Sequence, residues 1–288
     1  MSGLVNRIKS AFHNSGYYRN KQTINGKKVS RHNVNVEYSN FPIDAPLNIG
    51  DTLTPVVFKY LCDRFGLINK RQRKIIHLNM IGSIIGFKNY DAIIWGSGIL
   101  KESFENKIKA NSTLTKYDIR AVRGPLTRDI LLRCNYDCPE IYGDPAILMP
   151  LIYHPEGQSK KYEVSIIKHY SDHSEVPSNF HEISVVTGDY KHFIDEICAS
   201  KLVISSSLHG LIIAESYGIP TIWYNPSGRG EFKYRDWYLS LGIKRPAMIQ
   251  SLTEIGQSKN INLEYRISEM ANPLLKAFPL ELWRTKHE

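Results

Sequence analysis

The stretch from Ser205 to Gly210, Ser-Ser-Ser-Leu-His-Gly, combines residue types that could do chemistry. Histidine donates or accepts a proton near neutral pH, because its reference pKa is about 6.5. Three consecutive serines are poor strand formers, and a histidine at the mouth of a helix is not needed to fill a core. A nearby anionic ligand would keep the imidazole protonated, whereas a helix N-terminus would favour its neutral form. His209 is therefore either an acid or base in a reaction or a residue that caps the helix.

Three loops share one pattern, in which small residues follow the end of a strand and precede a helix. They are Ser97-Gly98, Arg123-Gly124 and the stretch 205–210. Such a loop directs backbone N–H groups and a positive helix end to one point, which suits an anion. Glycine-containing turns also occur throughout α/β folds for structural reasons. Each loop alone is therefore weak evidence for an anion site.

Short apolar runs alternate with segments of helical periodicity along most of the chain. We expect strands at 75–78, 92–95, 119–123, 163–167, 181–186, 201–205 and 221–224, and helices at 53–65, 126–133, 190–199, 211–217 and 261–287. This alternation predicts parallel sheets covered by helices on both faces. Asp51 precedes the first of these helices, where it favours the N-terminus by charge and by capping.

The length of 288 residues allows two domains, each with its own core. The polar stretch 153–161 contains a proline and a glycine and is the natural linker. We expect a basic extension at 1–35, an N-terminal α/β domain at 36–152, a C-terminal α/β domain at 160–260 and a helical segment at 261–288. Two α/β halves joined in this way enclose a cleft at the carboxyl ends of their strands, where ligands bind.

The net charge of +9 is concentrated near the start of the chain. Seven basic residues and no acidic residue lie between Met1 and Val36, and a second basic run occupies 70–74. Basic surfaces attract nucleic acid, anionic lipid or phosphorylated substrates. We do not expect nucleic-acid binding, because the patterns of RNA-binding sheets, helix-turn-helix motifs and zinc fingers are missing. The arm either contacts an anionic membrane or is simply solvated.

The remaining composition predicts a cytoplasmic protein, peripheral at the inner face of the membrane if the arm docks there. No stretch of about 18 apolar residues occurs, and the N-terminus lacks the apolar core of a secretory signal. The four cysteines are too few and too scattered for a disulfide framework. They are Cys62, Cys134, Cys138 and Cys198. We expect reduced thiols, no metal and no cofactor.

Five segments together resemble the polysaccharide pyruvyl transferase family over about residues 40–245. In chain order they are Asn-Ile-Gly-Asp (48–51), Gly-Ser-Gly-Ile (96–99), Val-Arg-Gly-Pro-Leu-Thr-Arg (122–128), Gly-Asp-Pro-Ala (143–146) and the long block 205–220 around Leu-His-Gly. The resemblance implies two Rossmann-like domains, similar to the B-type glycosyltransferase fold, with a cleft between them. It also implies transfer of a pyruvyl group from phosphoenolpyruvate to a sugar of a surface polysaccharide or its precursor, usually as a cyclic ketal.

The resemblance implies roles for individual residues. His209 would be the general acid or base, and Asp51 would either take a proton from the sugar or cap its helix. Arg123 would bind the anionic groups of the donor through its guanidinium, whereas Asp144 is expected to be a turn residue. Further donor contacts are expected from Ser97, Gly98, Ser205, Ser206, Ser207, Leu208, Lys233 and Arg235. Acceptor contacts are expected from Asn48, His169, Tyr170 and Glu215.

One position departs from the family pattern. Many relatives carry an arginine two residues before the motif histidine, where this chain has Ser207. The missing charge would then come from 168–170 or from 229–236, or the donor would differ. The alternative function is therefore a glycosyltransferase of similar fold that uses a nucleotide sugar. A non-catalytic scaffold that binds glycan or lipid is disfavoured by the intact motifs. The sequence does not identify the acceptor sugar, which in such pathways is often carried on a lipid.

Overall fold

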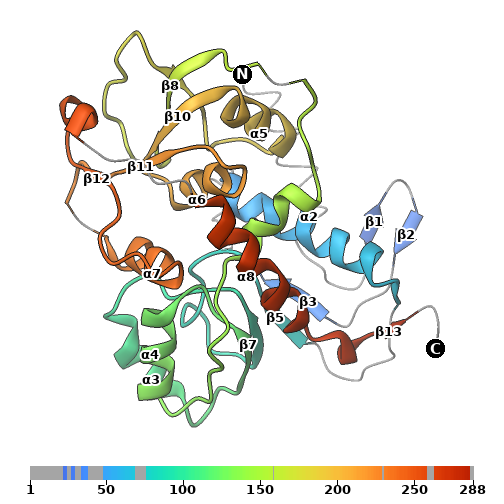
Figure 1. Ribbon diagram of the computed structural model, residues 1–288. Helices are drawn as coiled ribbons and strands as arrows, with labels where there is room; N and C mark the ends of the chain where they lie inside the picture. The colour runs from blue at the N-terminus through green and yellow to red at the C-terminus, as the bar shows by residue number, and fades with distance from the viewer. Residues whose placement is uncertain are drawn as a thin grey trace.

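The computed structural model describes residues 22–24, 27–29, 34–37, 48–68, 76–157, 159–228, 230–257 and 263–285. Its framework is a pair of parallel sheets, one from each half of the chain (Figure 1). The α/β fold with parallel sheets is therefore as the sequence predicts. The basic run 70–74 and most of the basic N-terminal segment lie outside the described residues, apart from a short antiparallel pair of strands. These are β1 (Gln22–Ile24) and β2 (Lys27–Val29).

The first sheet has four parallel strands. Their order is β3 (Val34–Glu37), β5 (Ile76–Asn79), β6 (Ala92–Trp95) and β7 (Tyr117–Ala121). All four side chains of β6 are buried, as expected for a strand with both faces covered. Ile94 of β6 packs in a cluster with residues of two helices that lie against each other. These helices are α3 (Phe104–Asn111) and α4 (Pro125–Arg133).

The second sheet has five parallel strands. Their order is β12 (Met248–Ile249), β11 (Thr221–Tyr224), β10 (Ser200–Ser205), β8 (Tyr162–Ile167) and β9 (His181–Glu182). Successive side chains of a strand point to opposite faces, so Val203 joins the main core while Ile204 joins a smaller cluster on the other face. The main-core face carries α5 (Tyr190–Cys198) and α6 (Leu208–Ser216). The smaller cluster includes residues of η2 (Leu252–Gln257).

Elements packed between the two sheets join the halves into one hydrophobic core. They are α2 (Ile49–Arg64), η1 (Pro145–Leu151), α7 (Phe232–Ser240) and α8 (Glu264–Lys276). Helix η1 packs against α2, α6 and α8, while α7 packs against α4. Trp95 of the first sheet donates a hydrogen bond from Nε1 to the carbonyl of Leu274 on α8 at 2.8 Å. The core is therefore continuous across the halves, and their division into two domains stays a prediction.

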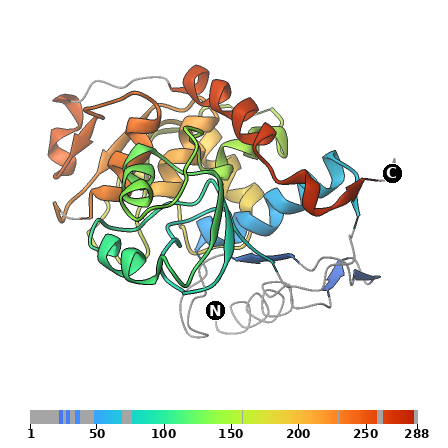
Figure 2. The ribbon, with the colours of Figure 1, turned by 90° about the horizontal axis from the view of Figure 1, so that it is seen from below.

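The end of the chain returns to α2. After α8 come η3 (Leu280–Leu282) and β13 (Arg284–Thr285), which pairs antiparallel with β4 (Leu67–Ile68) just beyond α2 (Figure 2). The C-terminal helix therefore ends at Lys276, and its expected continuation to residue 287 is wrong. Phe278 and Trp283 stack at 5.2 Å between ring centroids and attach this segment to the core.

Two helices begin earlier than the sequence predicts, in each case because a polar side chain caps the helix. Helix α2 starts at Ile49, since the side chain of Asn48 accepts a hydrogen bond from the N–H of Gly50. Asp51 is therefore in the first turn and is not the N-cap. Helix α6 starts at Leu208 because Ser207 is its N-cap.

Helices α3 and α7 are absent from the sequence prediction. Only Ile108 of α3 is buried, so this surface helix has a weak apolar pattern. The region of α7 was expected to be a source of charge. Its Tyr234, Trp237 and Tyr238 are buried at helical spacing, but only because neighbouring elements cover them. The strand expected at 181–186 is limited to the two residues of β9.

The described ranges contain no helix long and apolar enough to cross a membrane. They also contain no group of three or more His, Cys, Asp or Glu side chains that could hold a metal ion.

A buried carboxylate ties α6 to its neighbours. Glu215 of α6 accepts hydrogen bonds from Trp237 Nε1 and Tyr238 OH of α7, and from Thr221 Oγ1 of β11, all at 2.7–2.8 Å. Burial raises the pKa of Glu215 to about 7, and the three hydrogen bonds offset only part of this effect. The folded protein therefore holds a proton on Glu215 at a pH where the unfolded chain has lost it.

We expect the proton on Glu215 to make the difference in free energy of unfolding between wild type and Glu215→Gln depend on pH. Between the unfolded pKa near 4.5 and the folded pKa near 7, the folded state binds the extra proton. The stability of wild type relative to the variant should therefore fall as pH rises through this window, by at most about 1.4 kcal/mol per pH unit. Above pH 8 the difference should be constant. Urea unfolding at pH 5, 6, 7 and 8 measures it, and a difference that does not change with pH would contradict the prediction.

Candidate active site

The turn that carries His209 is built from serine hydroxyls. It joins β10 to α6, and Ser205, Ser206 and Ser207 are all buried. Ser205 Oγ lies 2.9 Å from the carbonyl oxygens of Ile167 and Ser207, and it accepts a hydrogen bond from the Ser207 N–H. The serines thus satisfy backbone groups of a buried turn, which explains why residues with low strand propensity occupy it.

A glycine on α2 makes room for the imidazole of His209. A Cβ added to Gly50 would lie 1.9 Å from His209 Nδ1, so the ring packs directly on the backbone of the first turn of α2. Gly210 has a similar role, since a Cβ there would lie 2.5 Å from Ser205 Oγ. The capping interpretation of His209 is wrong, because Ser207 is the N-cap and His209 is the second residue of the helix.

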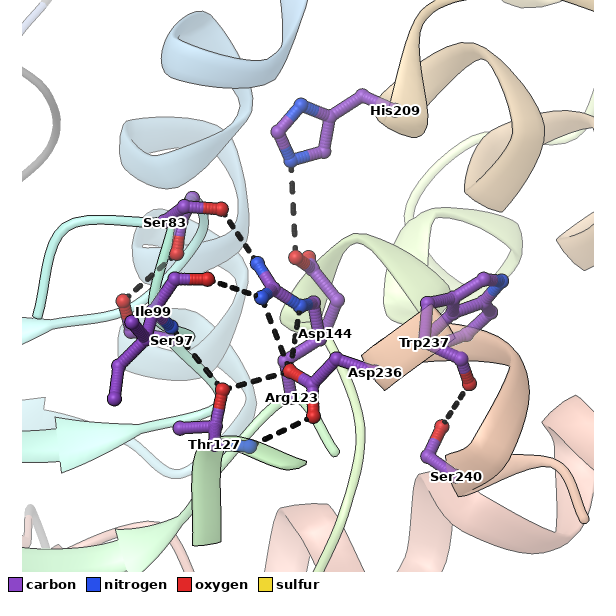
Figure 3. Close-up of polar contacts among 11 residues, drawn as sticks. Ser83, Ser97, Ile99, Arg123, Thr127, Asp144, His209, Asp236, Trp237 and Ser240 are labelled. Carbon is purple, nitrogen blue, oxygen red and sulfur yellow. Dashed lines mark hydrogen bonds and ion pairs between the residues drawn. The ribbon is translucent and has the colours of Figure 1, made fainter. Parts of the chain in front are cut away.

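Nε2 of His209 faces a buried carboxylate. Asp144 Oδ2 lies 3.7 Å from Nε2 (Figure 3), and the Asp144 side chain is fully buried. Asp144 Oδ1 accepts a hydrogen bond from the N–H of Ala146 at 3.0 Å, so Asp144 caps η1 and is the turn residue that the sequence predicts. Among the described residues, neither Oδ2 nor Nε2 has a hydrogen-bond partner.

This arrangement suits proton transfer to an anionic ligand. A carboxylate opposite one imidazole nitrogen orients the ring and compensates the positive charge of its protonated form. Buried polar atoms without partners are unfavourable, so Nε2 and Oδ2 are available to a ligand. The N-termini of α2, at Gly50, and of α6, at His209, meet at this point. Both helix ends carry partial positive charge, which favours an anion.

Arg123 is an interior residue that joins the two halves. It is completely buried, and Nε and Nη2 each lie 3.0 Å from Oδ2 of Asp236 on α7. Its other donors go to Ser83 Oγ at 2.6 Å and to the carbonyl of Ile99 at 2.7 Å (Figure 3). Asp236 also accepts from the N–H and hydroxyl of Thr127. This network favours a structural role for Arg123, and its predicted donor contact stays a prediction.

The loop at Ser97 and Gly98 supports that guanidinium. A Cβ on Gly98 would lie 2.3 Å from Arg123 Cζ. Ser97 Oγ and the Gly98 N–H both donate to the carbonyl of Gly82, at 2.8 and 3.0 Å. These groups hold the loop together, and their predicted contact with the donor also stays a prediction.

A cavity of about 530 Å³ borders the Ser205–Ser207 turn, because Ser206 is part of its lining. Its lining includes His169 and Asp172 after β8, Ser206 after β10, Asn225 after β11 and Lys233 on α7. It therefore lies at the carboxyl ends of the parallel strands of the second sheet, where α/β folds bind ligands. The cleft that the sequence predicts between two domains stays a prediction.

The ionisable groups of this cavity differ in charge. Burial, together with the nearby Lys233 and His209, lowers the pKa of His169 to about 4, so His169 is neutral at pH 7. Burial alone would raise the pKa of Asp172, but hydrogen bonds from Ser206 and Ser174 outweigh it and hold the pKa below its usual value. Asp172 therefore carries a negative charge.

The other predicted contacts are spread over the structure. Leu208 is buried in the core, and Arg235 is on the exposed face of α7. Asp51 is not the N-cap of α2, and because its side chain lies outside the described part, its role in taking a proton from the sugar stays a prediction. Of the predicted acceptor contacts, Asn48 caps α2 and Glu215 is buried in the core, which favours structural roles for both. His169 lines the cavity, and the ring of Tyr170, which is 41% exposed, lies 4.4 Å from it.

Sequence reasoning missed the partners of the candidate residues. Asp144 and Gly50 both stand in segments that resemble the family, yet nothing in the sequence places them against His209. Asp236 and Asn225 lie outside those segments, and only the folded chain brings Asp236 to Arg123 and Asn225 to the cavity. A buried glycine in the first turn of a helix was the one local signal, since alanine is the better helix former.

Because Gly50 and His209 are in contact, we expect the effect of Gly50→Ala on the free energy of unfolding to have opposite signs in wild type and in the His209→Ala variant. In wild type, Gly50→Ala should lower the free energy of unfolding, because the methyl group overlaps the imidazole. In the His209→Ala background it should raise stability by up to about 1 kcal/mol, because alanine has the higher helix propensity. Urea unfolding of the four proteins measures the coupling. The same effect of Gly50→Ala in both backgrounds would show that the two residues are not in contact.

Two relatives align with parts of this chain. An uncharacterized protein of Acanthamoeba polyphaga mimivirus is 30% identical over 200 residues, which cover 65% of this chain and 67% of the viral protein. The succinoglycan biosynthesis protein ExoV of Rhizobium meliloti (strain 1021) is 29% identical over 138 residues, which cover 44% of this chain and 42% of ExoV.

The fold and the family follow from two further comparisons. The crystal structure of a functionally uncharacterized protein from Klebsiella pneumoniae subsp. pneumoniae covers 72% of this chain and 90% of its own, with a TM-score of 0.51 and 18% identity. That likeness concerns the fold alone. The sequence profile described as polysaccharide pyruvyl transferase matches residues 50–228, which include Gly50, Arg123, Asp144 and His209. Because this match spans more than half of the chain, the protein belongs to the polysaccharide pyruvyl transferase family and is a transferase.

Proposed function

We propose that this protein transfers the pyruvyl group of phosphoenolpyruvate to two hydroxyls of a sugar in a surface polysaccharide or its precursor, forming a cyclic ketal. The observation that carries the proposal is the pairing of His209 and Asp144, 3.7 Å apart and without hydrogen-bond partners among the described residues, within the segment that matches the family. The succinoglycan role in the name of ExoV supports a polysaccharide as acceptor.

In this proposal His209 is the general acid. Imidazolium protonates the methylene carbon of phosphoenolpyruvate, which becomes a methyl group, and the neighbouring carbon becomes an oxocarbenium-like centre. A sugar hydroxyl attacks that carbon and gives its proton to the neutral imidazole, which restores the imidazolium. A second hydroxyl then replaces the phosphate, which leaves with the remaining proton. The products are the pyruvate ketal and inorganic phosphate. The carboxylate of Asp144 compensates the positive charge of the imidazolium before transfer.

The donor site in this proposal uses helix ends in place of the arginine that Ser207 replaces. Ser207 is buried and caps α6, so it orients the helix. The converging N-termini of α2 and α6 favour the negative charges of phosphoenolpyruvate next to His209.

The remaining sequence predictions are part of the same proposal. The chain would form two Rossmann-like domains arranged as in B-type glycosyltransferases, at 36–152 and 160–260. The protein would act in the cytoplasm, and the basic segment 1–35 would contact the inner face of the membrane, where a lipid-linked acceptor is anchored. No cofactor beyond the co-substrate is required by the reaction as written.

Phosphate release tests the reaction. We expect wild type to release inorganic phosphate from phosphoenolpyruvate only when a suitable sugar is present, with a product heavier by one pyruvyl ketal in the mass spectrum. His209→Ala should lower kcat by about 10²–10⁴-fold, because the general acid is lost. The matched control is His192→Ala on the exposed surface of α5, which should keep full activity.

Two outcomes would contradict the proposal. One is His209→Ala with nearly full activity and an unchanged melting temperature. The other is a protein whose melting temperature rises with a nucleoside diphosphate but not with phosphoenolpyruvate. The second outcome would favour the glycosyltransferase alternative.

The variant Asp144→Asn tests whether Asp144 positions the imidazole of His209 or binds phosphoenolpyruvate. Asparagine keeps an oxygen to cap η1 through Ala146 but removes the negative charge that faces His209. We expect kcat to fall at least about tenfold, while KM for phosphoenolpyruvate stays within about threefold, because the carboxylate acts through the imidazole. Circular dichroism and urea unfolding would verify the fold. An increase in KM with unchanged kcat would mean that Asp144 contacts the substrate instead.

A further inference from the structure

The cavity beside the Ser205–Ser207 turn contains a buried hydrogen-bond donor that lacks a partner. Asn225 lines this cavity and is only 5% exposed. Its backbone N–H donates to the carbonyl of Ile249, and its Oδ1 accepts from Ser227 Oγ at 3.2 Å, so the side chain is fixed. Its Nδ2 has no hydrogen-bond partner among the described residues. A buried donor of this kind is unfavourable unless a ligand provides an acceptor.

A complementary acceptor lies in the same cavity. Asp172 accepts three hydrogen bonds, from Ser206 Oγ at 2.6 Å and from the N–H and hydroxyl of Ser174 at 3.1 and 2.7 Å. A carboxylate has about four acceptor positions, so one remains for a ligand hydroxyl. The cavity thus offers a donor and an acceptor to the same occupant.

The charge balance of the cavity disfavours an anionic occupant. Asp172 is negative and Lys233 is positive, and both belong to the lining. The imidazole of His169 is neutral because burial and the nearby positive charges lower its pKa. Tyr224 and Tyr234 are buried and supply apolar surface to the same cavity. A neutral occupant with several hydroxyl groups fits this combination of polar atoms and ring surfaces better than a phosphate does.

The cavity is joined to the candidate active site by one residue. Ser206 stands three positions before His209 and lines the cavity. Its hydroxyl donates to Asp172 and accepts from the N–H of His169, and its carbonyl accepts from Tyr234 OH at 2.7 Å. The charge of His209 is also close enough to lower the pKa of His169. The cavity and the candidate active site are therefore formed by one continuous stretch of chain, from Ser206 to His209.

We propose that this cavity binds the saccharide acceptor as a neutral, hydroxyl-rich ring, with Asn225 as hydrogen-bond donor and Asp172 as acceptor. The role of this saccharide as the acceptor rests on the proposed function, whereas saccharide binding by the cavity does not depend on it. The volume of about 530 Å³ is in the usual range of small-ligand pockets. Lys233 then belongs to the acceptor site, where it offsets Asp172, and the donor is bound beside His209.

Saccharide binding can be measured without any reaction. Saturation-transfer NMR and calorimetry would test the full-length protein against neutral hexoses and disaccharides, with phosphoenolpyruvate and a nucleoside diphosphate as comparison ligands. We expect Asn225→Leu to weaken saccharide binding by about five- to tenfold, because the hydrogen-bond donor is lost. Asn225→Asp should weaken it by at least as much, because it replaces the donor with a carboxylate oxygen that only accepts hydrogen bonds. Asn89→Leu is the matched control, because Asn89 is exposed and bonds only to Asn111 among the described residues.

The kinetics separate this proposal from the proposed function. In a protein that releases phosphate from phosphoenolpyruvate, Asn225→Leu should raise KM for the sugar while leaving KM for phosphoenolpyruvate unchanged. If turnover occurs but KM for the sugar does not respond, the acceptor site is elsewhere and the function stands. If no turnover occurs but saccharide binding depends on Asn225, the cavity assignment stands and the function fails. Loss of nucleoside diphosphate or phosphoenolpyruvate binding in Asn225→Leu, with saccharide binding unchanged, would overturn the cavity assignment.

Discussion

The buried ion pair between Arg123 and Asp236 determines how the two halves of this protein fit together. Both side chains are completely buried, and a charge in such surroundings is tolerated only when every strong donor and acceptor is paired. Two glycines make the close approach possible. A Cβ on Gly98 would meet the guanidinium, and a Cβ on Gly124 would lie 1.9 Å from the Asp236 carbonyl oxygen. The pair therefore fixes the position of α7 against the first half.

Helix α7 transmits that placement to the candidate active site. Next to Asp236 in sequence, Trp237 and Tyr238 donate to Glu215 and so hold α6, the helix that has His209 in its first turn. One turn earlier, Tyr234 donates to the carbonyl of Ser206 in the turn before that helix. Asp144, in contrast, belongs to η1 on the other side of the core. Its distance from His209 thus depends on a chain of buried polar contacts, since a shift of α7 would move one partner and not the other.

The sequence predicts best what depends on near neighbours in the chain. Strands β6, β10 and β11 are predicted within one residue, because continuous apolar runs between turn residues leave few alternatives. The turn at Ser205–Gly210 is recognised for a similar reason, since its residue types are unusual for the place that they occupy. Helix α7 is missed because its aromatic side chains are buried only by contacts with α4, α6 and β11, which are distant in sequence.

The contacts of the candidate site are long-range, and this is why the sequence alone does not contain them. The prediction that Asp144 is a turn residue is confirmed, because one of its carboxylate oxygens caps η1. The other oxygen faces His209, which comes 65 positions later in the chain, and no local sequence pattern predicts this contact. Glu215 shows the opposite error. A carboxylate within a family-like segment suggests ligand binding, but burial and three hydrogen bonds make it part of the core.

The ring of His209 against Gly50 also constrains how related sequences can diverge. A side chain at position 50 is sterically incompatible with the imidazole, whereas the loss of the imidazole removes the only reason we find for glycine there. Substitutions at the two positions should therefore arise in a fixed order, first at 209 and then at 50. A descendant with a larger residue at position 50 would have lost the imidazole already, so the residue at that single position would report whether the imidazole is still present.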